Sequence, residues 1–142
     1  MKKLILVFVV ATFISLNANP QHTKDVPAKV KAAFGMKFPG AQSVHWGKEN
    51  ANEYEAEFVM DGIKMSANYG VNGTWLETES NIPVSQLPAA AAATIAKQYP
   101  KSAVIEADKI ERAGKGTLFE AVIETGAKKK EVLLNENGVI QK

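Results

Sequence analysis

The chain contains one segment twice, and this internal repeat constrains the fold more than any other feature of the sequence. The first copy covers residues 54–75 and the second covers residues 119–140, at a constant offset of 119 − 54 = 65 positions. Gly73 of the first copy falls on Gly138 of the second, and the alignment needs no gap. Because each copy of a repeat forms one supersecondary unit, the two segments are expected to fold alike.

The first copy predicts an antiparallel hairpin. Its Asp61-Gly62 pair favours a two-residue type I′ turn, in which both central residues have positive φ. A turn at that point pairs apolar residues on one face, because strand side chains alternate between faces. The pairs are Met60–Ile63, Phe58–Met65, Ala56–Ala67 and Tyr54–Tyr69. The opposite, wet face then carries Glu55, Glu57, Val59, Lys64, Ser66 and Asn68.

A helix is expected before each copy, since large apolar residues recur there every four positions. The two stripes are Val26, Val30, Phe34 and Phe38, and then Leu87, Ala91, Ile95 and Tyr99. Asp25 and Ser85 are the expected N-caps of these helices. In the first unit, one strand before the hairpin and one that begins with Trp75, opposite Tyr69, complete the sheet. The second unit is expected to have the same arrangement. The predicted fold class is α+β: a tandem repeat of one helix packed on a four-stranded antiparallel meander sheet.

The first 18 residues have the pattern of a signal peptide. Lys2 and Lys3 precede an apolar run, which the small residue Ala18 follows after a short polar step. The run is short for a membrane span, and an uncleaved N-terminal anchor is the alternative. The remaining chain is divided into a polar leader (19–25), a first α-β4 repeat (26–79), a linker (80–86) and a second α-β4 repeat (87–142).

The charge balance after cleavage argues against several classes of partner. Loss of residues 1–18 removes two of the 17 basic residues and none of the 15 acidic ones, so the mature formal charge is 15 − 15 = 0. No basic stripe remains to bind nucleic acid or an anionic membrane. The chain also has no cysteine, which excludes disulfides, a thiolate nucleophile and Cys-ligated zinc. A periplasmic or secreted protein that relies on its hydrophobic core is expected.

Three motifs carry a resemblance to a known family. They are the helix boundaries Val26-Pro27 and Phe38-Pro39, which recur as Leu87-Pro88 and Tyr99-Pro100; the segment Val44-His45-Trp46; and the turn Tyr69-x-x-Asn72-Gly73-x-Trp75. Over about residues 26–141 the chain resembles the PepSY-like, β-lactamase-inhibitor-protein-like family of small exported bacterial proteins. The resemblance implies the fold of an inhibitor that clasps a β-lactamase with its sheet surface. Related PepSY domains occur in protease propeptides, where a restraining role on peptidases is ascribed to them.

Catalytic and metal-binding chemistry finds little support in the sequence. The histidines His22 and His45 lack metal-ligand spacing, and no serine lies in a nucleophile turn. Glu55 and Glu57 share a strand face at about 6.5–7 Å, a spacing that overlaps that of inverting glycosidases. Since nothing in the sequence buries either carboxylate, a solvated sheet face is the favoured interpretation. No catalytic residue, metal or cofactor is therefore expected.

The aromatic residues leave two interpretations open. Trp46, Trp75, Tyr54 and Tyr69 could form a sugar-stacking surface. The hairpin register instead places most of them on the dry face, which favours a role in the core under the helix.

Two functional hypotheses follow from the sequence. The first is a non-catalytic exported binding protein, an inhibitor or modulator of another exported peptidase or hydrolase, that uses the wet sheet face. The predicted partner-binding residues are Glu55, Glu57, Lys64, Ser66 and Asn68, with Asn72 and Lys115 as the fallback. The alternative is a periplasmic small-ligand or peptide-binding protein with a cleft between the repeats. In neither case is a nucleic-acid partner expected, nor a membrane partner after signal cleavage.

Overall fold

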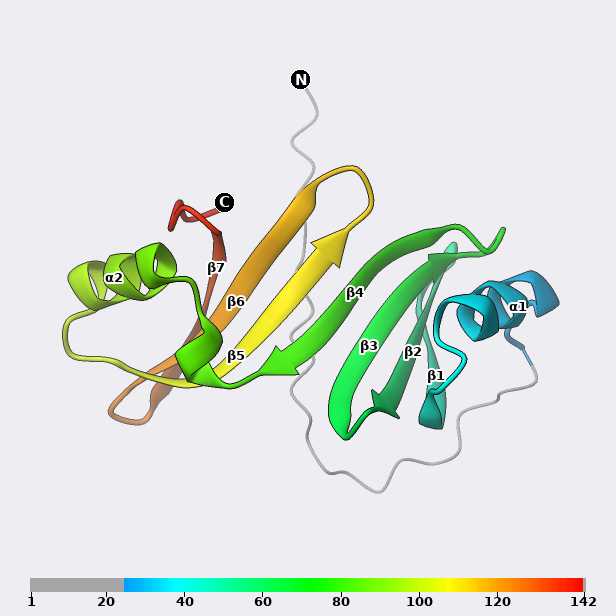
Figure 1. Cartoon of the computed structure of the whole chain (residues 1–142), viewed down its shortest axis with the longest axis horizontal. Helices are drawn as coiled ribbons and strands as arrows, with labels where there is room; N and C mark the ends of the chain where they lie inside the picture. The colour runs from blue at the N-terminus through cyan, green and yellow to red at the C-terminus, as the bar shows by residue number, and fades with distance from the viewer. Residues whose placement is uncertain (1–24, 142) are drawn as a thin grey trace.

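The computed structural model describes residues 25–141, which form two helices and seven strands (Figure 1). The predicted signal peptide (1–18) and nearly all of the predicted leader lie outside the described residues. The first half contains α1 (Ala28–Lys37), β1 (Gln42–Asn50), β2 (Glu53–Met60), β3 (Ile63–Gly70) and β4 (Trp75–Ile82). A short 3-10 helix, η1 (Val84–Gln86), leads into α2 (Ala89–Gln98), β5 (Ala103–Arg112), β6 (Gly116–Thr125) and β7 (Lys128–Asn135).

All seven strands belong to one antiparallel sheet, in the order β1-β2-β3-β4-β5-β6-β7. This differs from the expected pair of four-stranded units, because β4 of the first half pairs directly with β5 of the second, from Glu77↔Arg112 to Ile82↔Ala107. The edge of a sheet has unpaired backbone N–H and C=O groups, and pairing with β5 satisfies those of β4. After β7 the chain makes only an isolated bridge, Leu134↔Ile140, so the second half of the described sheet has three strands.

The predicted register of the first hairpin is confirmed. β2 and β3 pair Met60 with Ile63, and the pairing continues without a break to Tyr54 opposite Tyr69. The turn residues Asp61 and Gly62 both have positive φ, at 53° and 79°, as a type I′ turn requires. The expected pairing of Tyr69 with Trp75 is also present, next to an irregularity in the β3–β4 ladder.

Both helices cover the same face of the sheet. Ala67, in the core under α1, is the partner of Thr78, whereas Ala107, in the core under α2, is the partner of Ile82. Thr78 and Ile82 lie four residues apart on β4 and therefore on one face. Along the molecule, the helices lie at opposite ends, with α2 at the left and α1 at the right of Figure 1. No helix of residues 25–141 lies over the other face, which is called the open face below.

The apolar stripes form two separate cores. The four stripe residues of the first helix are buried beside Tyr54, Phe58 and Tyr69, with Met65 and Trp75 partly buried against them. Phe34 holds this core together through edge-on ring contacts, 5.0 Å from Phe58 and 5.2 Å from Trp46 between centroids. Under α2, Leu87, Ala91 and Ile95 are buried and Tyr99 is partly buried. The predicted helix stripes and first core are thus confirmed.

The predicted N-caps are wrong. Each helix is preceded by a proline in extended conformation, Pro27 or Pro88, with no side-chain capping bond. Proline is well suited to the start of a helix, because its fixed φ matches the first turn and it has no N–H to satisfy. Asp25 instead accepts a hydrogen bond at its carbonyl oxygen from the Tyr54 hydroxyl at 3.2 Å, and Ser85 lies in η1.

Candidate functional site

The open face holds all five predicted partner-binding residues. The β2–β3 ladder pairs Glu57 with Ser66 and Glu55 with Asn68, and it places Lys64 opposite Val59 on the same side. Ser66 is buried although no helix of residues 25–141 lies over it. Its partners across the two neighbouring ladders are Glu57 and Glu79, and all three residues line the cavity described next. A role of these five residues in binding stays a prediction.

A cavity of about 340 Å³ lies on the open face. Strands β2 to β7 all contribute to its lining, from Glu57 to Glu131. Neighbouring strands are about 4.8 Å apart, so the lining of this cavity extends across most of the width of the sheet. It is called the acidic cavity here because six carboxylates line it: Glu57, Glu79, Glu106, Asp108, Glu120 and Glu131.

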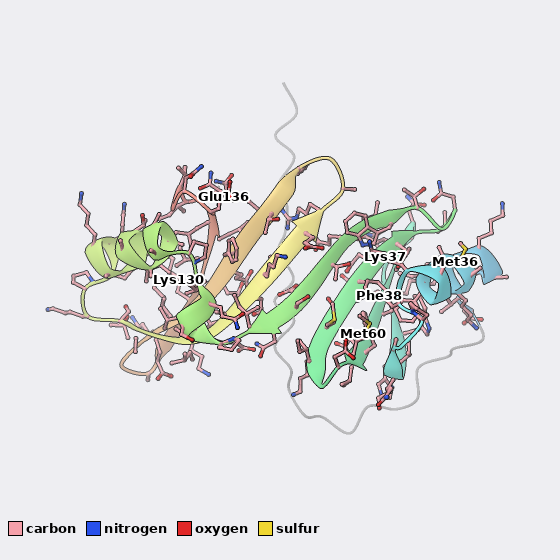
Figure 2. The ribbon with its side chains drawn as sticks, viewed as in Figure 1. Met36, Lys37, Phe38, Met60, Lys130 and Glu136 are labelled. Atoms are coloured by element: carbon pink, nitrogen blue, oxygen red, sulfur yellow. The ribbon has the colours of Figure 1, made fainter. Side chains whose placement is uncertain are left out.

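The remaining lining of the acidic cavity is mixed. Lys64, Lys129 and Lys130 are the basic residues, and Met65 and Val122 are the apolar ones. Lys130 (labelled in Figure 2) bonds to the residue that follows α2, because its Nζ donates a hydrogen bond to the Tyr99 hydroxyl at 2.9 Å. The same Nζ lies 4.6 Å from the centre of the Tyr99 ring. Carboxylates therefore outnumber ammonium groups by two to one, and one of those ammonium groups bonds to a tyrosine.

Three carboxylates meet at the centre of the acidic cavity. Glu79 on β4, Asp108 on β5 and Glu120 on β6 each offer an oxygen atom, and the three oxygens lie within 4.8 Å of one another. The ladders explain the meeting, since Asp108 is the direct partner of Glu120, and Glu79 lies on the strand next to β5. Asp108 is 8% exposed and accepts a hydrogen bond from the Asn81 side chain at 3.2 Å.

Burial and mutual repulsion raise the pKa values of this central group. Burial, and then the charges of Asp108 and Glu120, raise the pKa of Glu79 to about 8. Burial and neighbouring carboxylates raise the pKa of Glu120 to about 7, although Arg112 opposes the shift. Burial raises the pKa of Asp108 to about 6, against the effect of the Asn81 hydrogen bond. These carboxyl groups consequently exchange protons near neutral pH.

The expectation that nothing buries Glu55 is wrong. Burial comes first among the causes that raise the pKa of Glu55 to about 7, followed by the neighbouring carboxylates Glu49 and Glu57. A hydrogen bond with Ser66 acts in the opposite direction. Alternation along β2 could not indicate this burial, because the groups around Glu55 include Glu49 on β1 and Ser66 on β3.

The sequence did not indicate the central carboxylates, because the first repeat is predicted to end at residue 79 and to be followed by a linker at 80–86. The available signal was alternation: Glu77 and Glu79 are two apart, as are Glu106 and Asp108, which predicts a shared face within each strand. Only the pairing of β4 with β5 brings the two sets together.

As a chemical group, the three carboxylates can accept hydrogen bonds from a cation or supply the oxygen ligands that hard metal ions prefer. No histidine joins them among residues 25–141: His45 is exposed on the edge strand β1, and His22 lies outside the described part. The structure therefore supports neither histidine as a metal ligand at this site.

The aromatic residues belong to the core and not to a sugar-stacking surface. Tyr54 and Tyr69 are buried on the helix-covered face, and Trp46 packs against the same core. Trp75 donates from its ring nitrogen to the Thr78 hydroxyl at 2.9 Å, with Lys37 over its ring. This confirms the core interpretation of these residues.

Comparison with known proteins yields a family and several similar folds. A family model described as "Putative beta-lactamase-inhibitor-like, PepSY-like" matches residues 52–142. A search of curated proteins found no match. Within residues 25–141, neither helix is long and apolar enough to span a membrane.

Three crystal structures from Bacteroides share the fold. A BLIP-like protein of Bacteroides fragilis is 23% identical, with a TM-score of 0.70 over 82% of this chain and 84% of that one. A structure from Bacteroides eggerthii, described as "putative periplasmic proteins", is 17% identical, with a TM-score of 0.76 over 82% and 86%. A DUF2874 family protein of Bacteroides ovatus is 19% identical, with a TM-score of 0.73 over 82% and 84%. At these identities the likeness concerns the fold.

Proposed function

This chain belongs to the PepSY-like, β-lactamase-inhibitor-like family, and from that premise we propose that it is a non-catalytic exported protein that binds another exported protein through its open face. The observation that carries the proposal is the acidic cavity at the centre of that face. A helix-free sheet face with a hollow lined by charged groups offers shape and charge for recognition. The predicted residues Glu57, Lys64 and Ser66 all line this hollow, which supports their role in binding.

The partner is proposed to be an exported peptidase or hydrolase that this protein inhibits or modulates. The support is the family description together with the likeness to a fold named after a β-lactamase inhibitor. In an inhibitor, the binding surface need not contain a nucleophile–base pair, and the acidic cavity is lined by no histidine and by a single serine.

Export is proposed from the signal-like residues 1–18, and the description of the Bacteroides eggerthii structure as periplasmic supports it. Intact-mass measurement of the protein from its native host checks this directly. Loss of residues 1–18 is the expected result, and retention of Met1 would contradict it.

The two halves are further proposed to be copies of one α-β unit, at residues 26–79 and 87–142. In each half the Asn-Gly turn reaches under the preceding helix: Gly73 approaches the Lys29 carbonyl, and Gly138 approaches the Ala90 carbonyl. The turn positions are 65 apart, like the two hairpin segments, and the helix positions are 90 − 29 = 61 apart, like the two apolar helix stripes that begin at Val26 and Leu87.

Affinity capture from an extract of exported proteins tests the proposed function. The bait is the purified protein, compared with a charge-reversed variant, Glu57→Lys with Lys64→Glu. Glu111→Lys is the matched control, because Glu111 is an exposed carboxylate on the helix-covered side of β5. The expected result is a partner that the wild type and the control retain and the reversed variant loses. Capture that is insensitive to the reversal, or turnover of a substrate by the homogeneous protein, would contradict the proposal.

A second candidate function is binding of a small ligand or peptide, and the acidic cavity favours it specifically. Its volume of about 340 Å³ falls within the range of ligand sites, about 300–1,000 Å³, and residues from both halves of the sheet line it. A protein partner predicts capture of a folded protein in stoichiometric amounts. A ligand instead predicts a low-molecular-weight compound that co-purifies with the protein and is released on denaturation.

A further inference from the structure

The acidic cavity combines buried carboxylates with apolar lining. Glu79, Asp108 and Glu120 meet at its centre, and Val122, two residues from Glu120 on the same face of β6, contributes apolar surface. A long cationic side chain suits such a site, since its aliphatic stem packs on apolar atoms while its charged head bonds to carboxylates.

The charged groups that act on Glu79 are all acidic, whereas Arg112, which bonds to Glu77, lowers the pKa of Glu120. Besides burial, every group that shifts the pKa of Glu79 is itself acidic, from β2, β4, β5 and β6. The basic residues of the lining come from β3 and β7, and the ammonium group of Lys130 bonds to Tyr99. A cation from outside would therefore relieve repulsion that the folded chain otherwise balances by keeping protons on these groups.

Three carboxylates on three neighbouring strands favour a guanidinium over an ammonium. A guanidinium presents five N–H donors in a planar fork, is more weakly hydrated and stays charged at all physiological pH values. It can thus bond to more than one carboxylate at once, and its desolvation on entry costs less than that of an ammonium.

We propose that the acidic cavity receives an arginine side chain, presented by a surface loop of the protein partner. The inference rests on the proposed function and names the chemistry of the contact. The stem of the arginine lies against Val122, and its guanidinium bonds to the carboxylates of Glu79, Asp108 and Glu120. A partner that carries this arginine binds, and a partner with a neutral isostere there does not.

A peptide titration followed by NMR tests the inference with the purified full chain. The probe is a blocked Gly-Arg-Gly tripeptide, and the comparison peptide carries citrulline, which has nearly the shape of arginine without its charge. The expected result is that the arginine peptide binds about tenfold more tightly than the citrulline peptide. Its chemical-shift changes should centre on the backbone amides of Glu79, Asp108 and Glu120.

Substitutions locate the contact. Glu79→Gln with Glu120→Gln keeps the side-chain shapes and removes two negative charges, so the arginine preference should fall to within about twofold of citrulline. Glu111→Gln, on the other side of β5, should leave the preference unchanged. Equal binding of the two peptides, shifts centred elsewhere, or an undiminished preference in the double variant would each overturn the inference.

The same titration distinguishes an arginine site from a site for a metal ion or a free polyamine. Shifts at the three carboxylate positions with Ca²⁺ alone, and none with the arginine peptide, would assign the cavity to a metal ion and overturn the inference. The same pattern with spermidine would assign it to a free polyamine and overturn it likewise. If capture depends on the open face and the arginine peptide does not bind, the inference fails and the proposed function stands. If the peptide binds and capture is insensitive to the open face, the proposed function fails alone.

Discussion

Arg112 on β5 donates from Nε to a carboxylate oxygen of Glu77 on β4 at 2.5 Å, and this ion pair joins the two halves of the sheet. The two residues are direct partners at the end of the β4–β5 ladder. Their side chains are 14% and 27% exposed, so solvent screens the pair only partly. The pair therefore stabilises the pairing of β4 with β5, which connects the two halves of the sheet.

Removal of Arg112 should weaken the protein more than removal of a comparable surface lysine. Arg112→Ala is expected to lower the free energy of unfolding by about 1–3 kcal/mol, because it leaves a half-buried Glu77 without this partner. Lys109→Ala breaks a pair with Glu111 at 2.7 Å that is 41% and 49% exposed, and should cost about 0–1 kcal/mol. Urea denaturation measures the free energy of unfolding of both variants. Equal decreases would show that the Arg112–Glu77 pair stabilises the protein no more than the exposed pair does.

Substitution of Phe58 tests the packing of the first core. It is 3% exposed, and its ring lies 5.0 Å from Phe34 and 4.7 Å from Phe38 between centroids. Phe58→Ala should cost about 3–5 kcal/mol, through lost burial and the cavity left behind. Glu57→Ala, one residue away on the open face, should change stability by less than about 0.5 kcal/mol. Similar denaturation midpoints for the two variants would contradict the alternation of the hairpin.

The Asn-Gly turn of the first half should tolerate no side chain at Gly73. A Cβ atom there would lie 2.8 Å from the Lys29 carbonyl oxygen, and the residue has φ of +86°. Gly62 is a matched control, since it has φ of +79° with open space around it. Gly62→Ala should cost about 1–2 kcal/mol from backbone strain alone, and Gly73→Ala about 1–3 kcal/mol more from the clash. Thermal unfolding measures the difference, and identical melting temperatures would show that the turn does not lock under α1.

The acidic cavity should make the protein more stable as the pH falls toward 5. The folded-state pKa of Glu79 is about 8, against an ordinary value of 4.5, because of burial and then the charges of Asp108, Glu120, Glu77 and Glu55. Between these two pH values the folded state binds more protons than the unfolded state, so stability declines as the pH rises. The contribution is fully present below pH 4.5 and is lost as the pH passes through 8.

Glu79→Gln should remove this part of the pH dependence. The variant is expected to match the wild type near pH 5 and to exceed its unfolding free energy by roughly 1–3 kcal/mol at pH 8, a value reduced for solvent screening. Glu136→Gln, in the exposed turn after β7 (labelled in Figure 2), should change stability by less than about 0.5 kcal/mol at both values. Denaturation at pH 5, 6.5 and 8 supplies the comparison. A destabilised Glu79→Gln variant at pH 8 would contradict the raised pKa.

Local chemistry determined much of the first half of this protein. The Asp61-Gly62 turn and the alternation from Tyr54 to Tyr69 specify the hairpin register, because a slip of one residue would bury its charges. The four-residue stripe from Val26 to Phe38 specifies the buried side of α1 for the same reason. These features depend on neighbours in the chain, and a single sequence therefore contains them. The helix starts were less predictable, because a capping side chain and a proline compete for the same few positions.

The acidic cavity arises from the tertiary structure and could not be predicted from the sequence. It requires the free edge of β4 to pair with β5, so that Glu79 meets Asp108 and Glu120 from strands far apart in sequence. Burial in that cavity removes solvent from the carboxylates and raises their pKa values. Neither the pairing across the two halves nor this burial follows from alternation within one strand. For that reason the sequence predicted the face on which Glu57 and Ser66 lie, and only the fold formed a cavity there.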